Sequence, residues 1–107
     1  MTKIIAVTSI PDGRKNWVIS VETNEPTYLK VRYVPDKLIA DHVSIKNYIA
    51  NSLTQTWSSP EKMILTIIED INNELVPKWV QVFYSKNGVS ITIEERQPGL
   101  ENFAPPA

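Results

Sequence analysis

The stretch ISVETNEPTYLKV, from Ile19 to Val31, holds the side chains whose types could do chemistry. Ser20 could be a nucleophile if a neighbouring base removed its proton, and Glu22 and Glu25 could act as general acid and base if they met in the fold. The ordinary alternative is a hairpin connection whose acids are solvated. His42 is the only histidine and so the only imidazole base for Ser20.

Composition excludes several kinds of active site. The 107 residues include no cysteine and one histidine, which excludes disulfides, thiol nucleophiles, thiolate metal ligands and His-rich metal sites. A net charge of −1 gives no excess of positive charge that would predict binding to nucleic acid or to a membrane surface. No apolar run approaches the roughly 20 residues of a membrane span, and no signal peptide is recognisable. We therefore expect one cytoplasmic domain with neither a metal nor a membrane partner.

Two alternating segments predict a hairpin around the opening stretch. Apolar and polar residues alternate over Asn16–Glu22, as is typical of a strand. After a short connection, residues 27–34 repeat the pattern. This second strand places Tyr28, Lys30 and Arg32 together on one face. A further extended segment is expected near the N-terminus, at Lys3–Ile10.

Two helices are predicted in the middle of the chain. The first has apolar residues at spacings of three and four, with Asp41 or Ser44 as its N-cap. The second begins at SSPEK, with Ser59 as N-cap, Pro60 at the first helical position and Glu61 in the first turn. Its apolar stripe must pack against another element and comprises Met63, Ile64, Ile67, Ile68, Ile71 and Leu75.

Alternation returns after Lys78 and predicts a second hairpin. Asn87 and Gly88 supply the positive φ angles of its tight turn. We predict a single α+β domain over residues 1–96, in the order β-β-α-α-β-β, with a four-stranded antiparallel sheet and both helices on one face. Proline and glycine in residues 97–107 predict an extended or disordered tail. The uncovered sheet face and open edges predict a homo-oligomer.

This order resembles the short form of the tunnelling-fold (T-fold) enzymes that reduce 7-cyano-7-deazaguanine with NADPH in queuosine biosynthesis. The similarity runs from about Glu25 to about Arg96. Five sequence words carry it, in the family's order: RYVPDK, SIKNYI, PEKMILTIIEDI, VPKWVQV and GVSITI. The resemblance implies a multimeric barrel of joined sheets that binds a flat purine- or pterin-like ring at its subunit interfaces.

The resemblance assigns a substrate-binding role to Glu61. In the family a glutamate at the start of the second long helix recognises the guanine-like edge of the ring, and Glu61 falls on that position. A carboxylate can accept two parallel hydrogen bonds from a ring N–H and an exocyclic amine. The ordinary alternative is that Glu61 merely complements the helix dipole.

The resemblance also implies a cofactor segment. Its pattern, Glu-Ser-Lys-Ser-Leu-Lys-x-Tyr, contacts NADPH, and DHVSIKNY corresponds to it here. This chain keeps Ser44, Lys46 and Tyr48, shortens the acid to Asp41 and replaces a lysine by Val43. The alternative is a capped amphipathic helix with Tyr48 in the core and Lys46 in solvent.

The opening stretch departs from the family. The reductases carry Cys-Pro-x-Thr-Gly-Gln-Pro-Asp, whose cysteine adds to the nitrile and whose aspartate donates a proton. Ser20 stands at the nucleophile position and Thr27 at the acid position. Because a serine needs an adjacent base while a cysteine is easily activated, the two losses argue against thiol-type nitrile reduction.

Three functions stay open from the sequence. The first is a divergent relative that keeps a purine or 7-deazaguanine pocket through Glu61 without the nitrile chemistry. The second is an active NADPH-dependent reductase that uses other residues. The third is a tRNA- or protein-interaction module, in which Tyr28, Lys30 and Arg32 stack on and neutralise a single strand.

Overall fold

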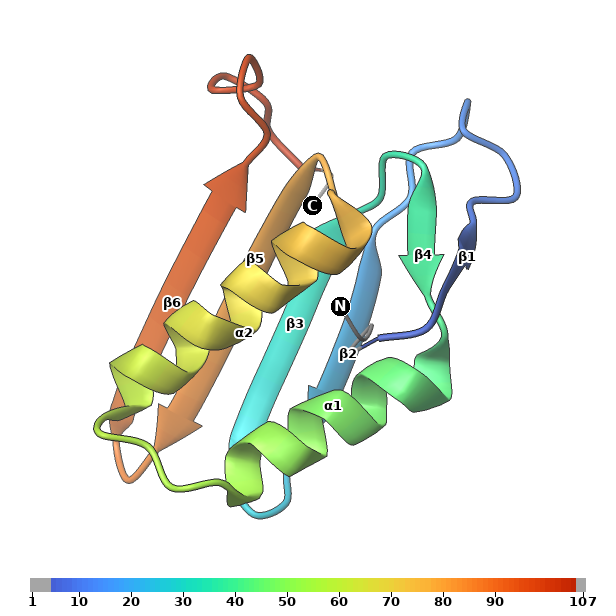
Figure 1. Ribbon diagram of the computed structural model, residues 1–107. Helices are drawn as coiled ribbons and strands as arrows, with labels where there is room; N and C mark the ends of the chain where they lie inside the picture. Colours follow the sequence, from blue (N-terminus) through green and yellow to red (C-terminus); the bar gives the residue numbers. More distant parts are fainter. Residues whose placement is uncertain (1–4, 106–107) are drawn as a thin grey trace.

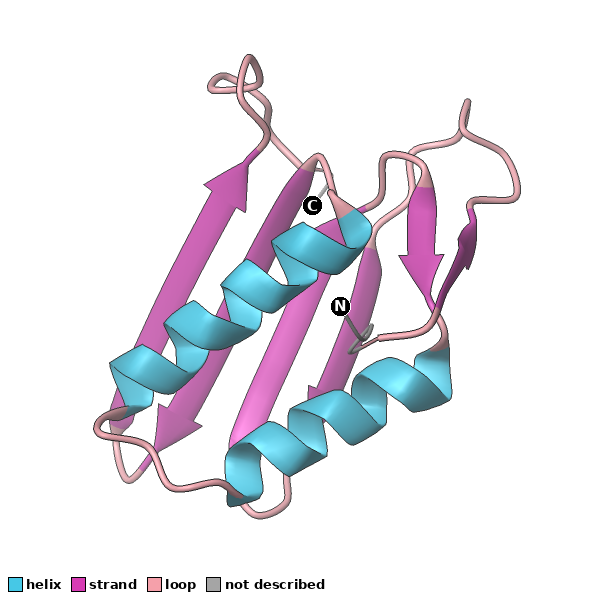
Figure 2. Cartoon of the chain, viewed as in Figure 1, coloured by secondary structure: helices cyan, strands magenta, loops and turns pink. Residues whose placement is uncertain are grey.

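The structure, a computed structural model, describes residues 5–105 and is built on one four-stranded antiparallel sheet. Its strands lie in the order β2-β3-β5-β6: β2 (Ile19–Thr23), β3 (Tyr28–Val34), β5 (Trp79–Lys86) and β6 (Val89–Arg96). Helices α1 (His42–Thr54) and α2 (Pro60–Leu75) both cover one face of this sheet (Figures 1 and 2). The predicted α+β class, strand pairing and one-sided helical layer are confirmed.

A two-stranded ribbon beside the main sheet was not predicted. Strands β1 (Val7–Ser9) and β4 (Leu38–Ala40) pair antiparallel. The predicted β-β-α-α-β-β order is confirmed for the main sheet and the two helices, and the ribbon adds two short strands to it. Strand β4 was not predicted, because three residues are too few for alternation to be recognised. The extended segment predicted at Lys3–Ile10 is confirmed at β1, while Lys3 and Ile4 lie outside the described residues. Strand β2 also begins three residues later than predicted, at Ile19 instead of Asn16.

The helix starts follow the predicted capping chemistry. The Asp41 carboxylate accepts a hydrogen bond from the Ser44 amide at 3.0 Å and caps α1. The Ser59 hydroxyl does the same for α2, accepting from the Lys62 amide at 3.2 Å. Each bond satisfies one of the free N–H groups at a helix start. All six residues of the predicted α2 stripe are buried, which fixes this helix over β5 and β6.

The core lies between the helices and the front face of the sheet. The strand register brings Val21, Val31 and Val82 side by side there, and all three are buried. Tyr33 shares this face, and its hydroxyl accepts the Ala40 amide at 3.0 Å. That bond joins the ribbon to the main sheet.

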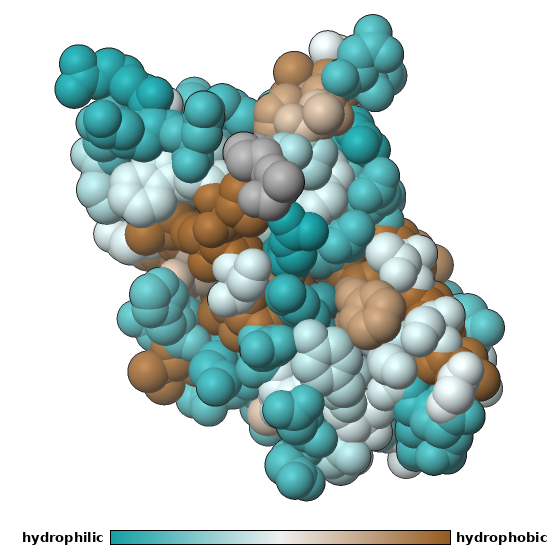
Figure 3. Space-filling view, turned by 180° about the vertical axis from the view of Figure 1, so that it is seen from behind, coloured by the Kyte–Doolittle hydropathy of each residue, from teal (hydrophilic) through white to brown (hydrophobic). Residues whose placement is uncertain are grey.

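The opposite face of the sheet has no helical layer. Alternation sends Ser20, Glu22, Lys30 and Arg32 to this side. Figure 3 shows this face, with hydrophobic side chains gathered toward the side on which β2 and the ribbon lie in the turned view. Within residues 5–105, no strand pairs with the outer edge of β2 or of β6. None of the described helices is long and apolar enough to cross a membrane.

Candidate functional site

A groove of about 680 Å³ runs along the free edge of β2, and we call it the β2-edge groove. The groove combines an apolar wall with four side chains that can do chemistry. The apolar wall comprises Pro11, Trp17, Val18, Ile19, Val21 and Ile39. The four chemical side chains are Ser20 and Glu22 from β2, and His42 and Lys46 from α1. Their arrangement follows from the fold, because α1 packs against β2.

Most of the polar side chains of this groove have no partner in the part of the chain that the structure describes. Ser20, His42 and Lys46 are exposed, and their side chains make no hydrogen bond or ion pair with residues 5–105. Glu22 is the exception, since its carboxylate accepts the Tyr28 hydroxyl at 2.7 Å. That hydrogen bond raises the pKa of Tyr28. The groove thus keeps a hydroxyl, an imidazole and an ammonium group available to a ligand.

The shared lining places the only histidine in the same groove as the residue at the nucleophile position. Sequence reasoning named His42 as the sole candidate base but gave no reason for it to approach Ser20. The approach comes from β4, which turns the chain so that α1 starts beside the edge of β2. The sequence did contain one signal: His42 and Lys46 are four residues apart, about one helical turn, and such residues are neighbours on a helix surface.

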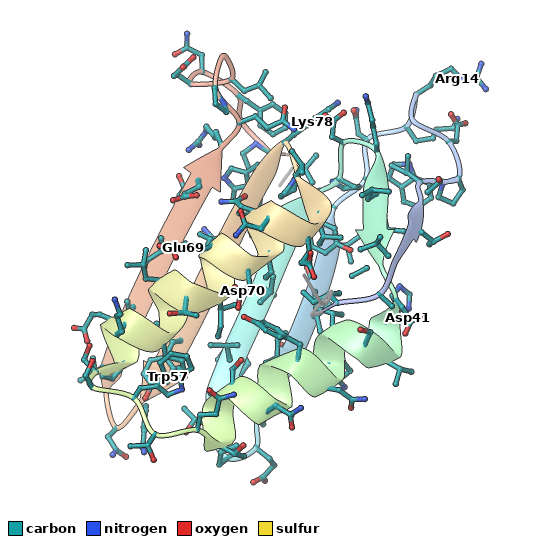
Figure 4. All side chains as sticks on the ribbon, in the orientation of Figure 1. Arg14, Asp41, Trp57, Glu69, Asp70 and Lys78 are labelled. Carbon is teal, nitrogen blue, oxygen red and sulfur yellow. The ribbon has the colours of Figure 1, made fainter. Side chains whose placement is uncertain are left out.

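A second groove, of about 650 Å³, lies on the other side of α1, and we call it the interhelical groove. Its lining is polar and contains no lysine or arginine: Asp41, Val43, Ser44, Asn47, Tyr48, Asn51, Ser52, Gln55, Trp57, Thr66 and Asp70. Figure 4 shows Asp41 at the start of α1, Trp57 between the helices and Asp70 on α2.

Four of the residues that line the interhelical groove form a hydrogen-bond network: Tyr48, Ser52, Trp57 and Asp70. The Tyr48 hydroxyl donates to the Asp70 carboxylate at 2.5 Å, and the Ser52 hydroxyl donates to the Tyr48 carbonyl at 2.9 Å. The Trp57 indole N–H donates to the Ser52 carbonyl at 2.7 Å. Burial, and then the bond to Asp70, raise the pKa of Tyr48. This network links α1 to α2.

The three residues retained from the cofactor pattern do not form one surface in the single chain. Ser44 and Tyr48 line the interhelical groove, whereas Lys46 lines the β2-edge groove. The Ser44 hydroxyl accepts the Ala6 amide at 2.9 Å, and the Tyr48 hydroxyl is bonded to Asp70. Lys46 is therefore the only one of the three whose polar group is free for a phosphate. Residues of one chain alone do not fit NADPH.

Glu61 lies at the first turn of α2, away from both grooves. Its side chain is exposed and makes no hydrogen bond or ion pair with residues 5–105. The neighbouring residues Ser59, Pro60 and Met63 line a pocket of about 260 Å³. Thr27 and Tyr84 contribute to the same pocket. Glu61 does not itself line this pocket; it is an exposed carboxylate at the positive end of a helix whose first residues do line it.

The nucleophile and acid positions of the family are separated in this chain. Ser20 lines the β2-edge groove, and Thr27 lines the pocket at the start of α2. Glu25 is exposed in the β2–β3 turn, where its amide donates to the Thr23 hydroxyl at 3.3 Å. Glu22 lines the β2-edge groove, and Glu25 lines neither that groove nor the pocket at the start of α2.

The basic and aromatic residues of β3 share the uncovered sheet face, as the alternation indicates. Tyr28 packs edge to face against Phe83, with ring centroids 5.8 Å apart. The Arg32 guanidinium lies over the Trp79 ring, 5.4 Å from its centroid. Across residues 5–105, no cluster of three His, Asp or Glu side chains could hold a metal ion.

Comparison with known proteins gives the family. The model of the family described as QueF-like protein matches residues 26–101. None of the curated proteins matches the chain. The matched segment begins in the β2–β3 turn and covers the rest of the main sheet and both helices. This chain belongs to the QueF-like family.

Proposed function

We propose that this protein binds a guanine-like base, of the purine or 7-deazaguanine type, through the Glu61 carboxylate, and that it has no thiol-based nitrile reduction. The observation that carries the proposal is the exposed Glu61 carboxylate, which has no partner among residues 5–105 and stands in the helix turn whose Ser59, Pro60 and Met63 line a small pocket. A charged acceptor without such a partner can accept both the ring N–H and the exocyclic amine of such a base.

The missing thiol supports the second half of the proposal. The sequence contains no cysteine that could add to a nitrile carbon. Ser20 is exposed on an edge strand, and the pocket beside Glu61 does not include it. Base binding and nucleophilic attack are therefore separated within one chain.

An assembly of several copies would bring Glu61 of one copy near the β2-edge groove of another. Glu61, Leu65 and Glu69 form an exposed row on α2, at spacings of four residues, and α2 contacts β5 and β6. His42 and Lys46 lie beside the opposite edge, at β2. Pairing β6 of one copy with β2 of the next would place the acidic row near the basic groove, in a homo-oligomer. NADPH binding remains a prediction for that assembled form.

The test measures base binding by titration calorimetry, with guanine and 7-cyano-7-deazaguanine as ligands. We expect Glu61→Ala to weaken binding by about 10- to 100-fold, because hydrogen bonds to a charged group contribute about 1.5–3 kcal/mol. The control is Glu101→Ala, which removes an exposed glutamate of the tail, outside the α2 row and outside the pocket at the start of α2. Equal affinities in the two variants, or no binding of either base to the unaltered protein, would overturn the proposal.

A second candidate function follows from the β2-edge groove. There Ser20 lies with the only imidazole and with Lys46, a set that supports a reductase using non-standard residues. Oxidation of NADPH that depends on the nitrile substrate, and that is lost in Ser20→Ala and His42→Ala, would establish this candidate. Binding without any NADPH oxidation would leave the ligand-binding function alone.

A further inference from the structure

A separate pocket of about 350 Å³ lies at the end of the sheet where β3 ends and β5 begins. Two segments distant in sequence close it, the loop before β2 and the tail after β6. Figure 1 shows both segments at this end of the sheet. The lining residues are Ile10, Gly13, Lys15, Asn16, Trp17, Val34, Pro35, Lys78, Phe103 and Ala104. We call it the dilysine pocket.

Hydrogen bonds hold its two aromatic walls. The Trp17 indole N–H donates to the Asp12 carbonyl at 2.7 Å, which fixes the ring on its own loop. The Arg96 guanidinium donates to the Phe103 carbonyl at 2.7 Å, which returns the tail to the end of β6. The Gln97 side-chain amide donates to the Asp36 carboxylate at 3.0 Å. The pocket is therefore built by specific contacts of the tail.

Among residues 5–105, the side chains that line the dilysine pocket carry positive charge only. Lys15 and Lys78 are its only charged lining residues, and neither forms an ion pair with residues 5–105. Asp12 and Asp36, each within three residues of a lining residue, are already bonded. Asp12 accepts the Arg14 amide and guanidinium at 3.0 and 3.2 Å, and Asp36 accepts Gln97. Two ammonium groups beside apolar walls favour a ligand with an anionic end and an apolar body.

We propose that the dilysine pocket binds a small phosphate monoester with an aromatic group, of the nucleoside monophosphate class. A phosphate monoester carries a charge of about −1.5 to −2 at neutral pH, which matches two lysines. Trp17 and Phe103 offer ring surfaces on which the aromatic group can stack. The volume lies near the lower end of the roughly 300–1,000 Å³ of small-molecule pockets, which favours a mononucleotide over a dinucleotide.

The test uses titration calorimetry with AMP, adenosine and inorganic phosphate. Adenine is chosen because it lacks the adjacent ring N–H and amine that Glu61 would hold. We expect AMP to bind at least about tenfold more tightly than adenosine or phosphate, and the double variant Lys15→Ala/Lys78→Ala to lose that advantage. The control Lys62→Ala removes an exposed lysine outside the pocket and should bind AMP normally.

A second variant separates the ring contact from the charge. Phe103→Ala should weaken AMP but leave inorganic phosphate unchanged, and Glu61→Ala should change neither. Unaltered circular dichroism of each variant shows that it is folded. Equal binding of AMP and adenosine would overturn the proposal, and so would phosphate binding as tightly as AMP, which would indicate an adventitious ion only. Loss of AMP binding in Lys62→Ala would also overturn it.

Discussion

The two grooves on either side of α1 have similar volumes but differ in what their polar groups contact. In the interhelical groove, Tyr48, Ser52 and Asp70 are engaged in a network that joins two helices. In the β2-edge groove, His42 and Lys46 have no partner in the described part of the chain. A satisfied network stabilises the fold, whereas unpaired polar groups beside an apolar wall are what a ligand needs.

The residues that match the family's cofactor pattern therefore fall into two groups, those that hold the fold together and one that is available to a ligand. Ser44 and Tyr48 match the cofactor pattern and hold the fold together, through the Ala6 amide and Asp70. Lys46 also matches the pattern, yet nothing in the described fold uses its ammonium group. The comparison therefore predicts large stability effects on one side of α1 and small ones on the other.

The largest effect is expected from Tyr48→Phe. The variant removes the only hydroxyl that bonds the half-buried Asp70 carboxylate, which should lower the free energy of unfolding by about 1–3 kcal/mol. Urea denaturation followed by circular dichroism measures the loss. Lys46→Ala is the matched control on the same helix and should change stability by less than about 0.5 kcal/mol. Similar losses in the two variants would mean that the two grooves do not differ in this way.

A smaller effect is expected from two tryptophans that make equivalent bonds. Trp57→Phe removes the 2.7 Å bond to the Ser52 carbonyl near the end of α1 and should cost about 1 kcal/mol. Trp17→Phe removes a 2.7 Å bond to the Asp12 carbonyl, in a loop where residues 13–16 are exposed, and should cost about half as much. Thermal denaturation of the two variants shows which of them loses more stability. A larger loss of stability in Trp17→Phe than in Trp57→Phe would mean that the stabilising hydrogen bonds lie at the β2 edge and not between the helices.

The smallest effect is expected from pH. Burial raises the pKa of Tyr33 and Tyr48 above the ordinary tyrosine value of 10.0, so the folded chain keeps protons that the unfolded chain releases. Stability should therefore be complete below about pH 10 and fall as the pH rises above that value. Denaturation midpoints measured on both sides of pH 10 test this. Tyr48→Phe should show a shallower decline, since one of the two groups is absent.

Much of the fold follows from short-range patterns in the sequence. Asp41, Ser59 and Pro60 determine the helix starts, and Asn87 with Gly88 takes the positive φ angles of the predicted hairpin turn, 51° and 81°. The α2 stripe is fully apolar on one side and can pack in only one orientation. Each of these signals lies within a few residues of the element it determines.

The grooves could not be predicted in the same way, because they join distant segments. Strand β4 is three residues long, and its partner β1 lies about 30 positions earlier. Without that ribbon, nothing in the sequence places His42 in the same groove as Ser20. The dilysine pocket likewise depends on Phe103 returning to Trp17 across nearly the whole chain. Its lysines carried no local pattern that distinguished them from surface lysines.

The unpaired edges of β2 and β6 have a consequence for how the protein should be assayed. If β6 of one copy completes the groove beside β2 of another, ligand affinity becomes subject to mass action between subunits. Dilution would then lower apparent affinity without any change in the single chain. A titration in the nanomolar range would report subunit dissociation together with ligand binding, and an assay at cellular concentration would not.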